Sequence, residues 1–144
     1  MSSPNAHKLY SLDILRLATS LPHNDTLEAT QSTATCRSPV CGSEMTVDVK
    51  LDDTRRIASV AIRAKACALG QAAAAVLRSK ALGLDATQIR QVYDNLEAAL
   101  QQGSGDLGWA ELEPFRYAYD FPARHGAIML PFNTLLAALE KAEG

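Results

Sequence analysis

The chain has 144 residues, of which 47% are hydrophobic and 21% charged, a composition typical of a soluble globular protein and unlike that of a disordered chain. Its 14 basic and 16 acidic residues give a formal net charge of −2, so the composition indicates neither a nucleic-acid partner nor an anionic membrane. The longest mainly apolar stretch, residues 66–77, is too short for a membrane span of about 20 residues. We expect one domain over residues 1–144, with residues 1–8 flexible. We also expect a cytoplasmic protein, because the polar N-terminus lacks the apolar core of a secretory signal.

The first half of the chain is predicted to form one short helix and three strands. Apolar residues at helical spacing predict an amphipathic helix over residues 9–19, which ends at a cluster of turn residues. Residues 27–35, rich in Thr and Ser, are predicted to form a polar edge strand. Apolar and polar residues then alternate over residues 45–51 and 58–65, a period of two that is typical of half-buried strands. Because only a short turn separates these two strands, we expect them to pair as an antiparallel hairpin.

The second half is predicted to be helical. One helix is expected from Gly70 to about residue 82, and another from about residue 86 to residue 102. A short helical turn over residues 107–115 and an aromatic segment follow. An amphipathic helix closes the chain, and Pro131 either lies in its first turn or kinks a helix that begins earlier. The order α-β-β-β-α-α-α predicts an α+β fold in which helices cover a small three-stranded antiparallel sheet.

Three cysteines, Cys36, Cys41 and Cys67, are the first candidates for a functional site. An odd number of cysteines in a chain without an export signal does not indicate a disulfide framework. Cys41 lies beside a proline and a glycine, so we expect it in a turn just before a strand. Cys67 lies where a strand passes into a helix, and the unpaired N–H groups and dipole at a helix start favour a thiolate.

Two cysteines and a histidine are predicted to gather at one end of the sheet. The residues between Cys41 and Cys67 hold two strands and one turn, and a hairpin of nearly equal arms returns the chain to its start. His125 lies at the start of the last helical segment, again at the end of an element. Two sulfur ligands and one imidazole at loop tips are typical of zinc and iron–sulfur sites. The pattern therefore favours a metal site here, although the chain has no CxxC pair to strengthen the signal.

Three short motifs resemble the NifU/IscU/SufU-type iron–sulfur cluster assembly scaffolds. They are Ser-Pro-Val-Cys-Gly at residues 38–42, Ala-Cys-Ala-Leu-Gly-Gln-Ala-Ala at 66–73 and Phe-Pro-Ala-Arg-His-Gly-Ala at 121–127. The order of elements is also similar, and the resemblance covers about residues 9–142. It implies a SufE/NifU-like fold and a scaffold or carrier, not an enzyme, that holds a transient [2Fe–2S] cluster, or iron or zinc. It further implies a cysteine desulfurase as sulfur donor and client or carrier proteins as acceptors of the cluster.

The resemblance carries the family's ligands over only in part. Cys41 matches the first cysteine of the family and Cys67 the second. The aspartate usually found two residues after the first cysteine is Ser43 here, and a neutral hydroxyl is a poorer metal ligand than a carboxylate. The family's four ligands are three cysteines and this aspartate. The third cysteine is also missing here, so two of the four expected ligands are replaced.

The position of the missing third cysteine depends on the alignment. One alignment places Ala127 there; the other places Gly126 there and His125 on the histidine that often precedes this cysteine. Three alternatives follow: His125 replaces the cysteine, Cys36 moves in as a ligand, or the chain has lost metal chemistry and kept the fold. The plain alternative for Cys36 is an incidental exposed thiol.

Other roles remain open at this point. Arg124 either helps to hold sulfide or an anionic cluster, as an outer partner of the site, or is a solvated surface charge. A degenerate scaffold fold would act as a zinc-binding or metal-free protein-interaction module. A cysteine enzyme would use Cys67 as nucleophile and His125 as base, but the sequence indicates no oxyanion donors and no orienting acid for it.

Overall fold

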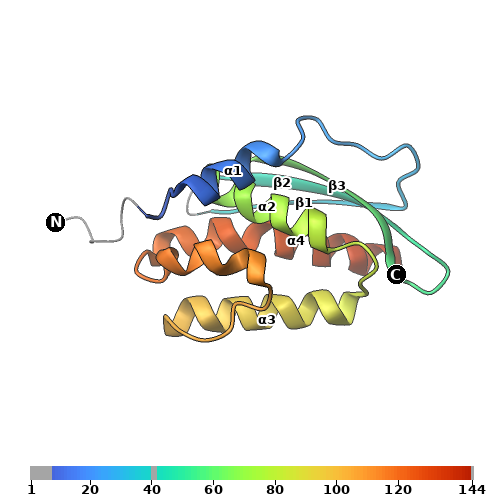
Figure 1. The fold of residues 1–144 in the computed structure, drawn as a ribbon. Coiled ribbons are helices and arrows are strands. Elements are labelled where there is room, and N and C mark those ends of the chain that lie inside the picture. Colours follow the sequence, from blue (N-terminus) through green and yellow to red (C-terminus); the bar gives the residue numbers. More distant parts are fainter. Residues whose placement is uncertain (1–7, 40–41, 144) are drawn as a thin grey trace.

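The computed structural model describes residues 8–39 and 42–143, and it confirms the predicted α+β fold class. Helices and strands follow the predicted order, with two 3₁₀ helices (η1 and η2) added before the last α-helix (Figure 1). The elements are α1 (Leu12–Ser20), β1 (Ser32–Arg37), β2 (Glu44–Leu51), β3 (Ile57–Lys65), α2 (Ala68–Lys80), α3 (Ala86–Gln102), η1 (Ala110–Ala118), η2 (Pro122–Arg124) and α4 (His125–Glu143).

The three strands form one antiparallel sheet in the order β1-β2-β3, and its two faces differ sharply. Alternate residues of β2, namely Met45, Val47 and Val49, are fully buried on the inner face. Helices α2 and α4 cover this face, and α3 lies on the far side of α4 (Figure 1). The period-two pattern of the sequence thus gives a sheet whose apolar side is packed and whose other side is polar.

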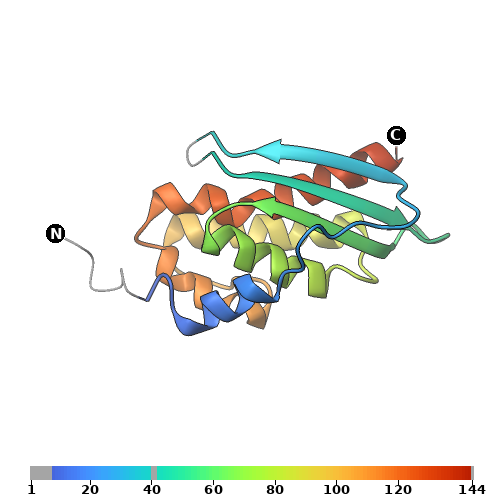
Figure 2. The same cartoon turned by 90° about the horizontal axis from the view of Figure 1, so that it is seen from above.

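Helix α1 packs alongside α2, and the segment after it crosses β3 and β2 to reach β1 (Figure 2). The side chain of Asp25 in this segment accepts hydrogen bonds from Arg78 Nε at 2.6 Å and from the Ile62 main-chain N–H at 3.4 Å. Arg63 donates to the Asp25 carbonyl and also to both carboxylate oxygens of Asp48. This chain of charged hydrogen bonds fixes the segment against β3.

The edge strand begins later than predicted. Its expected range was residues 27–35, and the structure has Ser32–Arg37 instead, paired with Glu44 to Val49 of β2. A polar Thr/Ser stretch carries no hydrophobic alternation that could fix the strand ends, so its limits are set by pairing with β2. One consequence is that Cys36 lies inside β1, opposite Met45, on the side that packs against the core.

The last helix begins at His125, so Pro131 lies inside it, which is the second of the two alternatives that the sequence left open. Proline has no N–H, and it therefore leaves the carbonyl of the residue four positions earlier, Ala127, without its helical donor. That carbonyl lies against α2: a Cβ added to Gly70 would stand 3.4 Å from the Ala127 oxygen and 2.9 Å from the Ala66 Cβ. Only a residue without a side chain fits this close approach.

The aromatic segment also differs from expectation. The predicted short turn and aromatic stretch form one nine-residue 3₁₀ helix, η1, which contains Pro114. Runs of 3₁₀ helix longer than three or four residues are uncommon, because their hydrogen-bond geometry is poorer. Here Leu112 and Phe115 are fully buried, so packing into the core holds the segment in this conformation.

Candidate functional site

The strands bring the chain segments beside Cys41 and Cys67 to the same end of the sheet. Glu44 pairs with Lys65 as the last pair of the β2–β3 ladder at that end. The connection from β1 to β2 is closed by hydrogen bonds from Ser38 N–H to the Ser43 carbonyl, at 2.8 Å, and from Gly42 N–H to the Ser38 carbonyl, at 2.9 Å. Cys41 itself lies outside the described residues. The flanking segments lie where the hairpin prediction requires them.

Cys67 is the N-cap residue of α2, with extended backbone angles of φ −66° and ψ 171°. Its carbonyl accepts the first helical hydrogen bond, from Gln71 N–H at 3.0 Å. Its side chain makes no capping hydrogen bond in the described part of the chain, although Ser, Thr or Asp usually provides one at this position. The thiol is half-buried. Helix α2 therefore begins with a sulfur atom beside N–H groups that have no helical partner.

His125 is the first residue of α4, and its ring is anchored to η1. The Nε2 atom lies 2.7 Å from the carbonyl oxygen of Ala118. A carbonyl oxygen can only accept a hydrogen bond, so Nε2 carries the proton and Nδ1 is the bare nitrogen of the neutral ring. This is the arrangement found in metal-binding histidines, whose second nitrogen donates to a carbonyl or carboxylate. Within the described residues, no hydrogen bond joins His125 to Cys67.

The two residues that follow His125 lie in different surroundings. A Cβ added to Gly126 would stand 3.3 Å from Ser38 Oγ, so position 126 faces the turn that connects β1 and β2. Ala127 is only 1% exposed and is packed beside Gly70 of α2. Of the two candidate positions for the missing cysteine, 126 is the one with a contact to this turn among the described residues. The sequence could not predict that Ser38 neighbours position 126, because the two residues are distant in the chain.

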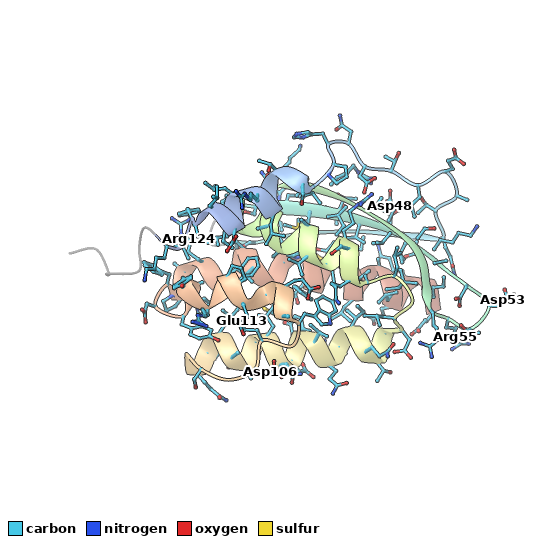
Figure 3. The ribbon with its side chains drawn as sticks, viewed as in Figure 1. Asp48, Asp53, Arg55, Asp106, Glu113 and Arg124 are labelled. Atoms are coloured by element: carbon cyan, nitrogen blue, oxygen red, sulfur yellow. The ribbon has the colours of Figure 1, made fainter. Side chains whose placement is uncertain are left out.

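The remaining candidate residues are placed as follows. Ser43 is buried, at 5% exposure, at the end of the same turn. Arg124 is exposed in η2 and lies at the end of the molecule opposite Asp53 and Arg55 of the hairpin turn (Figure 3). Cys36 is half-buried against the core, so it is not the freely exposed thiol of the plain alternative.

Within residues 8–39 and 42–143, no three His, Cys, Asp or Glu side chains lie close enough to hold an ion together. This finding does not bear on the ligand set of Cys41, Cys67 and His125, because Cys41 is not among the residues described.

The ionised groups around the site are held by partners of their own. A hydrogen bond from Arg37 holds the pKa of Glu44 below its ordinary value. Arg63 likewise lowers the pKa of Asp48 by hydrogen bonding, in opposition to the effect of burial. Both carboxylates are thus already engaged with arginines, and the described groups near this end whose donor atoms suit a soft metal are Cys36, Cys67 and His125.

The α+β fold of this chain is that of a known protein family. A model of the NifU-like N-terminal domain matches residues 9–112, and the chain belongs to that family. Among solved structures, it is similar to the N-terminal part of a NifU-like protein from Brucella abortus. The two are 28% identical with a TM-score of 0.88, covering 96% of this chain and 97% of the other.

A second similar structure supports the fold alone. It is an iron–sulfur cluster assembly scaffold protein for the SUF system from Fervidobacterium islandicum AW-1. It is 23% identical with a TM-score of 0.80 and covers 93% of this chain and 98% of the other. No curated protein matches the sequence. None of the described helices is long and apolar enough to cross a membrane.

Proposed function

We propose that this protein is a scaffold or carrier in iron–sulfur cluster assembly that binds iron or zinc, and a transient [2Fe–2S] cluster, through Cys41, Cys67 and His125. Membership of the NifU-like N-terminal domain family supports this proposal. The observation that carries it is the position of Cys67 at the start of α2, without a capping hydrogen bond in the described chain. The last β2–β3 pair, Glu44 with Lys65, lies at this same end.

His125 is proposed as the third ligand, through Nδ1. The contact from Nε2 to the Ala118 carbonyl supports this role, since it leaves Nδ1 as the basic nitrogen. Imidazole is an established ligand of [2Fe–2S] iron in Rieske-type centres. Two thiolates and one neutral imidazole carry less negative charge than three thiolates and a carboxylate, and they leave one coordination position to a partner. Such a site suits cargo that arrives and leaves by ligand exchange.

The partners follow from this chemistry. A cysteine desulfurase would supply the sulfur, and client or carrier proteins would take the finished cluster. Arg124 would act as an outer partner that attracts sulfide or the anionic cluster to this end of the molecule. The protein forms and breaks only metal–ligand bonds, so it is not an enzyme in this proposal. An enzyme that used Cys67 with His125 as base is disfavoured, because no hydrogen bond joins the two side chains within the described residues.

Anaerobic reconstitution tests the proposal. The protein is incubated with ferrous iron, cysteine and a cysteine desulfurase, and visible absorbance and bound iron are measured. We expect a coloured protein whose absorbance is lost in Cys67→Ser and in Cys41→Ser. Cys36→Ser is the matched control, because Cys36 packs against the core from within β1, and it should keep the absorbance. A colourless, iron-free protein, or an effect of Cys36→Ser equal to that of Cys67→Ser, would contradict the proposal.

A second candidate function is a zinc-binding or metal-free protein-interaction module. The observation that favours it is the replacement of two family ligands by Ser43 and by a residue without a thiol at position 126 or 127. Metal analysis of the purified protein separates the two functions. Stoichiometric zinc that resists chelators would indicate a closed structural site, whereas a scaffold should release its metal readily.

A further inference from the structure

Strand β3 is an edge strand of the sheet, so every second residue points its main-chain N–H and C=O away from β2. Near the end of the strand, side chains form hydrogen bonds with outward main-chain groups of Ile62 and Ala66. The N–H of Ile62 donates to the carboxylate of Asp25, and the carbonyl of Ala66 accepts a hydrogen bond from the side-chain amide of Gln71 at 2.8 Å. Between them lies Ala64. Because residues of an antiparallel strand alternate in direction, the N–H and C=O of Ala64 also point away from β2.

Ala64 lies in the wall of a cavity of about 350 Å³. The segment 21–24, which follows α1, forms one side of the cavity, and the ends of β2 and β3 with Gln71 of α2 form the others. The cavity therefore exposes one main-chain donor and one main-chain acceptor, side by side, at the edge of a sheet. Such an edge is a template for pairing with another extended chain.

Some of the charged side chains that line the cavity already have a partner, and one does not within the described residues. Arg63 is occupied by Asp48, and Glu44 is occupied by Arg37 at 2.5 Å. Lys65 is exposed and lines the cavity, and the described residues provide no ion pair for it within 4 Å. An approaching segment would thus meet an ammonium group whose nearest carboxylate already has a partner, which favours an acidic side chain in that segment.

We propose that the edge of β3 at Ala64 is a docking site for an extended, acidic segment of a partner protein. A residue of that segment accepts a hydrogen bond from the Ala64 N–H and donates one to the Ala64 carbonyl, and an Asp or Glu next to it pairs with Lys65. A free anion could use the N–H and the ammonium group but not the carbonyl, so the paired donor and acceptor favour a peptide. Lys65 is two residues before Cys67, so the docked segment lies next to the start of α2.

Binding of short peptides to the metal-free, reduced protein tests this proposal independently of cluster chemistry. A displayed library of short random peptides is selected on the protein, and the dissociation constants of enriched peptides are measured by fluorescence anisotropy. We expect enriched peptides to carry Asp or Glu among β-branched residues. We expect Ala64→Pro, which removes only an outward N–H, and Lys65→Glu each to weaken binding by about tenfold or more. Lys50→Glu is the matched control, since Lys50 is an exposed lysine of β2 near the hairpin turn, and it should bind as the unchanged protein does.

Several results would overturn the proposal. One is a selection that enriches no peptide over the same selection on Ala64→Pro; another is equal binding by all three variants. Competition by acetate or phosphate at the concentration of the peptide would identify a small-anion site instead. A dimer in sedimentation experiments that Ala64→Pro abolishes would assign the edge to a second copy of this chain. Lys65→Glu leaves the backbone unchanged, so the test stands even if Ala64→Pro does not fold.

Discussion

The two ends of the β2–β3 hairpin are built from the same ladder but differ in how their polar groups are satisfied. At the turn, one carboxylate oxygen of Asp52 accepts hydrogen bonds from Thr54 N–H, Thr54 Oγ1 and Arg56 N–H. At the other end, Cys67 begins α2 without a capping hydrogen bond in the described chain. The main-chain N–H groups of the turn are thus bonded to a side chain of the turn itself, whereas the N–H groups at the start of α2 have no such side-chain acceptor from Cys67. In Figure 3, Asp53 of the hairpin turn and Arg124 of η2 lie at opposite ends of the molecule.

The largest expected effect comes from adding a thiol at the cysteine end. In Gly126→Cys the new side chain would face the turn that connects β1 and β2, where Ser38 Oγ is 3.3 Å from the added Cβ. Changes even in the outer partners of a metal ligand alter affinity about 10–100-fold, so an added thiolate should raise zinc affinity by at least about tenfold. Competition with a chromophoric chelator measures this.

The matched control for that change is Ala127→Cys, because Ala127 is buried and its main chain lies beside Gly70 of α2. It should leave zinc affinity unchanged. A gain in zinc affinity by Ala127→Cys alone would assign the missing ligand of the family to position 127, and equal gains by both variants would show that position 126 has no special place in the site.

The next effect concerns the close approach of α2 and α4. Gly70→Val should lower the free energy of unfolding by about 1–3 kcal/mol, because even a Cβ would stand 2.9 Å from the Ala66 Cβ. Urea denaturation measures the loss. Ala68→Val, two residues earlier in the half-buried first turn of α2, serves as the control and should cost less. Equal losses of stability in the two variants would show that α2 and α4 leave room for a side chain at position 70.

A smaller effect is expected between the two ends, at Asp48. Asp48→Asn should lower the free energy of unfolding at neutral pH by about 1 kcal/mol, because the partly exposed Arg63 loses a charged acceptor. Hydrogen bonding from Arg63 lowers the pKa of Asp48 in the folded protein. The stabilisation is therefore present above the ordinary carboxyl pKa of 3.8 and is lost as the pH falls through the lowered value.

Thermal unfolding of Asp48→Asn and of the unchanged protein, measured as a function of pH, tests the role of the Asp48 carboxylate. The difference in stability between the two proteins should be constant from neutral pH to about the ordinary carboxyl pKa and should shrink below it. Asp94→Asn removes an exposed helical pair with Arg90, and it should show little difference at any pH. If the stability difference between Asp48→Asn and the unchanged protein grew toward acidic pH, the sign of the pKa shift would be contradicted.

The smallest effect is expected at the turn. Asp52→Ala removes the acceptor for the main-chain N–H groups of Thr54 and Arg56, so hydrogen exchange at these amides should become faster. Zinc affinity should stay the same, because the change is confined to the closed end. A change in zinc affinity would mean that the two ends are coupled through the ladder.

The sequence predicted best where local signals were complete. Helix α3 was predicted at both ends, because Asp85 caps its start in a capping box with Gln88, and Gly103 adopts the left-handed conformation that ends a helix. The period-two pattern likewise predicted the hairpin. The polar edge strand was misplaced because its Thr and Ser residues show no hydrophobic alternation in the sequence.

The candidate site could be predicted only in outline. Counting the residues of the hairpin was enough to bring the flanks of Cys41 and Cys67 to one end. The partner of His125 could not be predicted, because Ala118 contributes a main-chain carbonyl from a 3₁₀ helix whose conformation depends on packing. The proximity of Ser38 to Gly126 was equally out of reach, since it depends on how α4 docks onto the sheet.

Pro131 has a consequence for how the start of α4 is held in place. Because it cannot donate to the Ala127 carbonyl, the six residues before it, including His125 and Gly126, are joined to the rest of the helix by one hydrogen bond fewer than usual. Prolines are where helices bend most readily. The first turns of α4 are therefore held in place less by the helical hydrogen bonds than by contacts with the rest of the molecule, through the buried side chains of Ile128 and Leu130 and the hydrogen bond from His125 to Ala118.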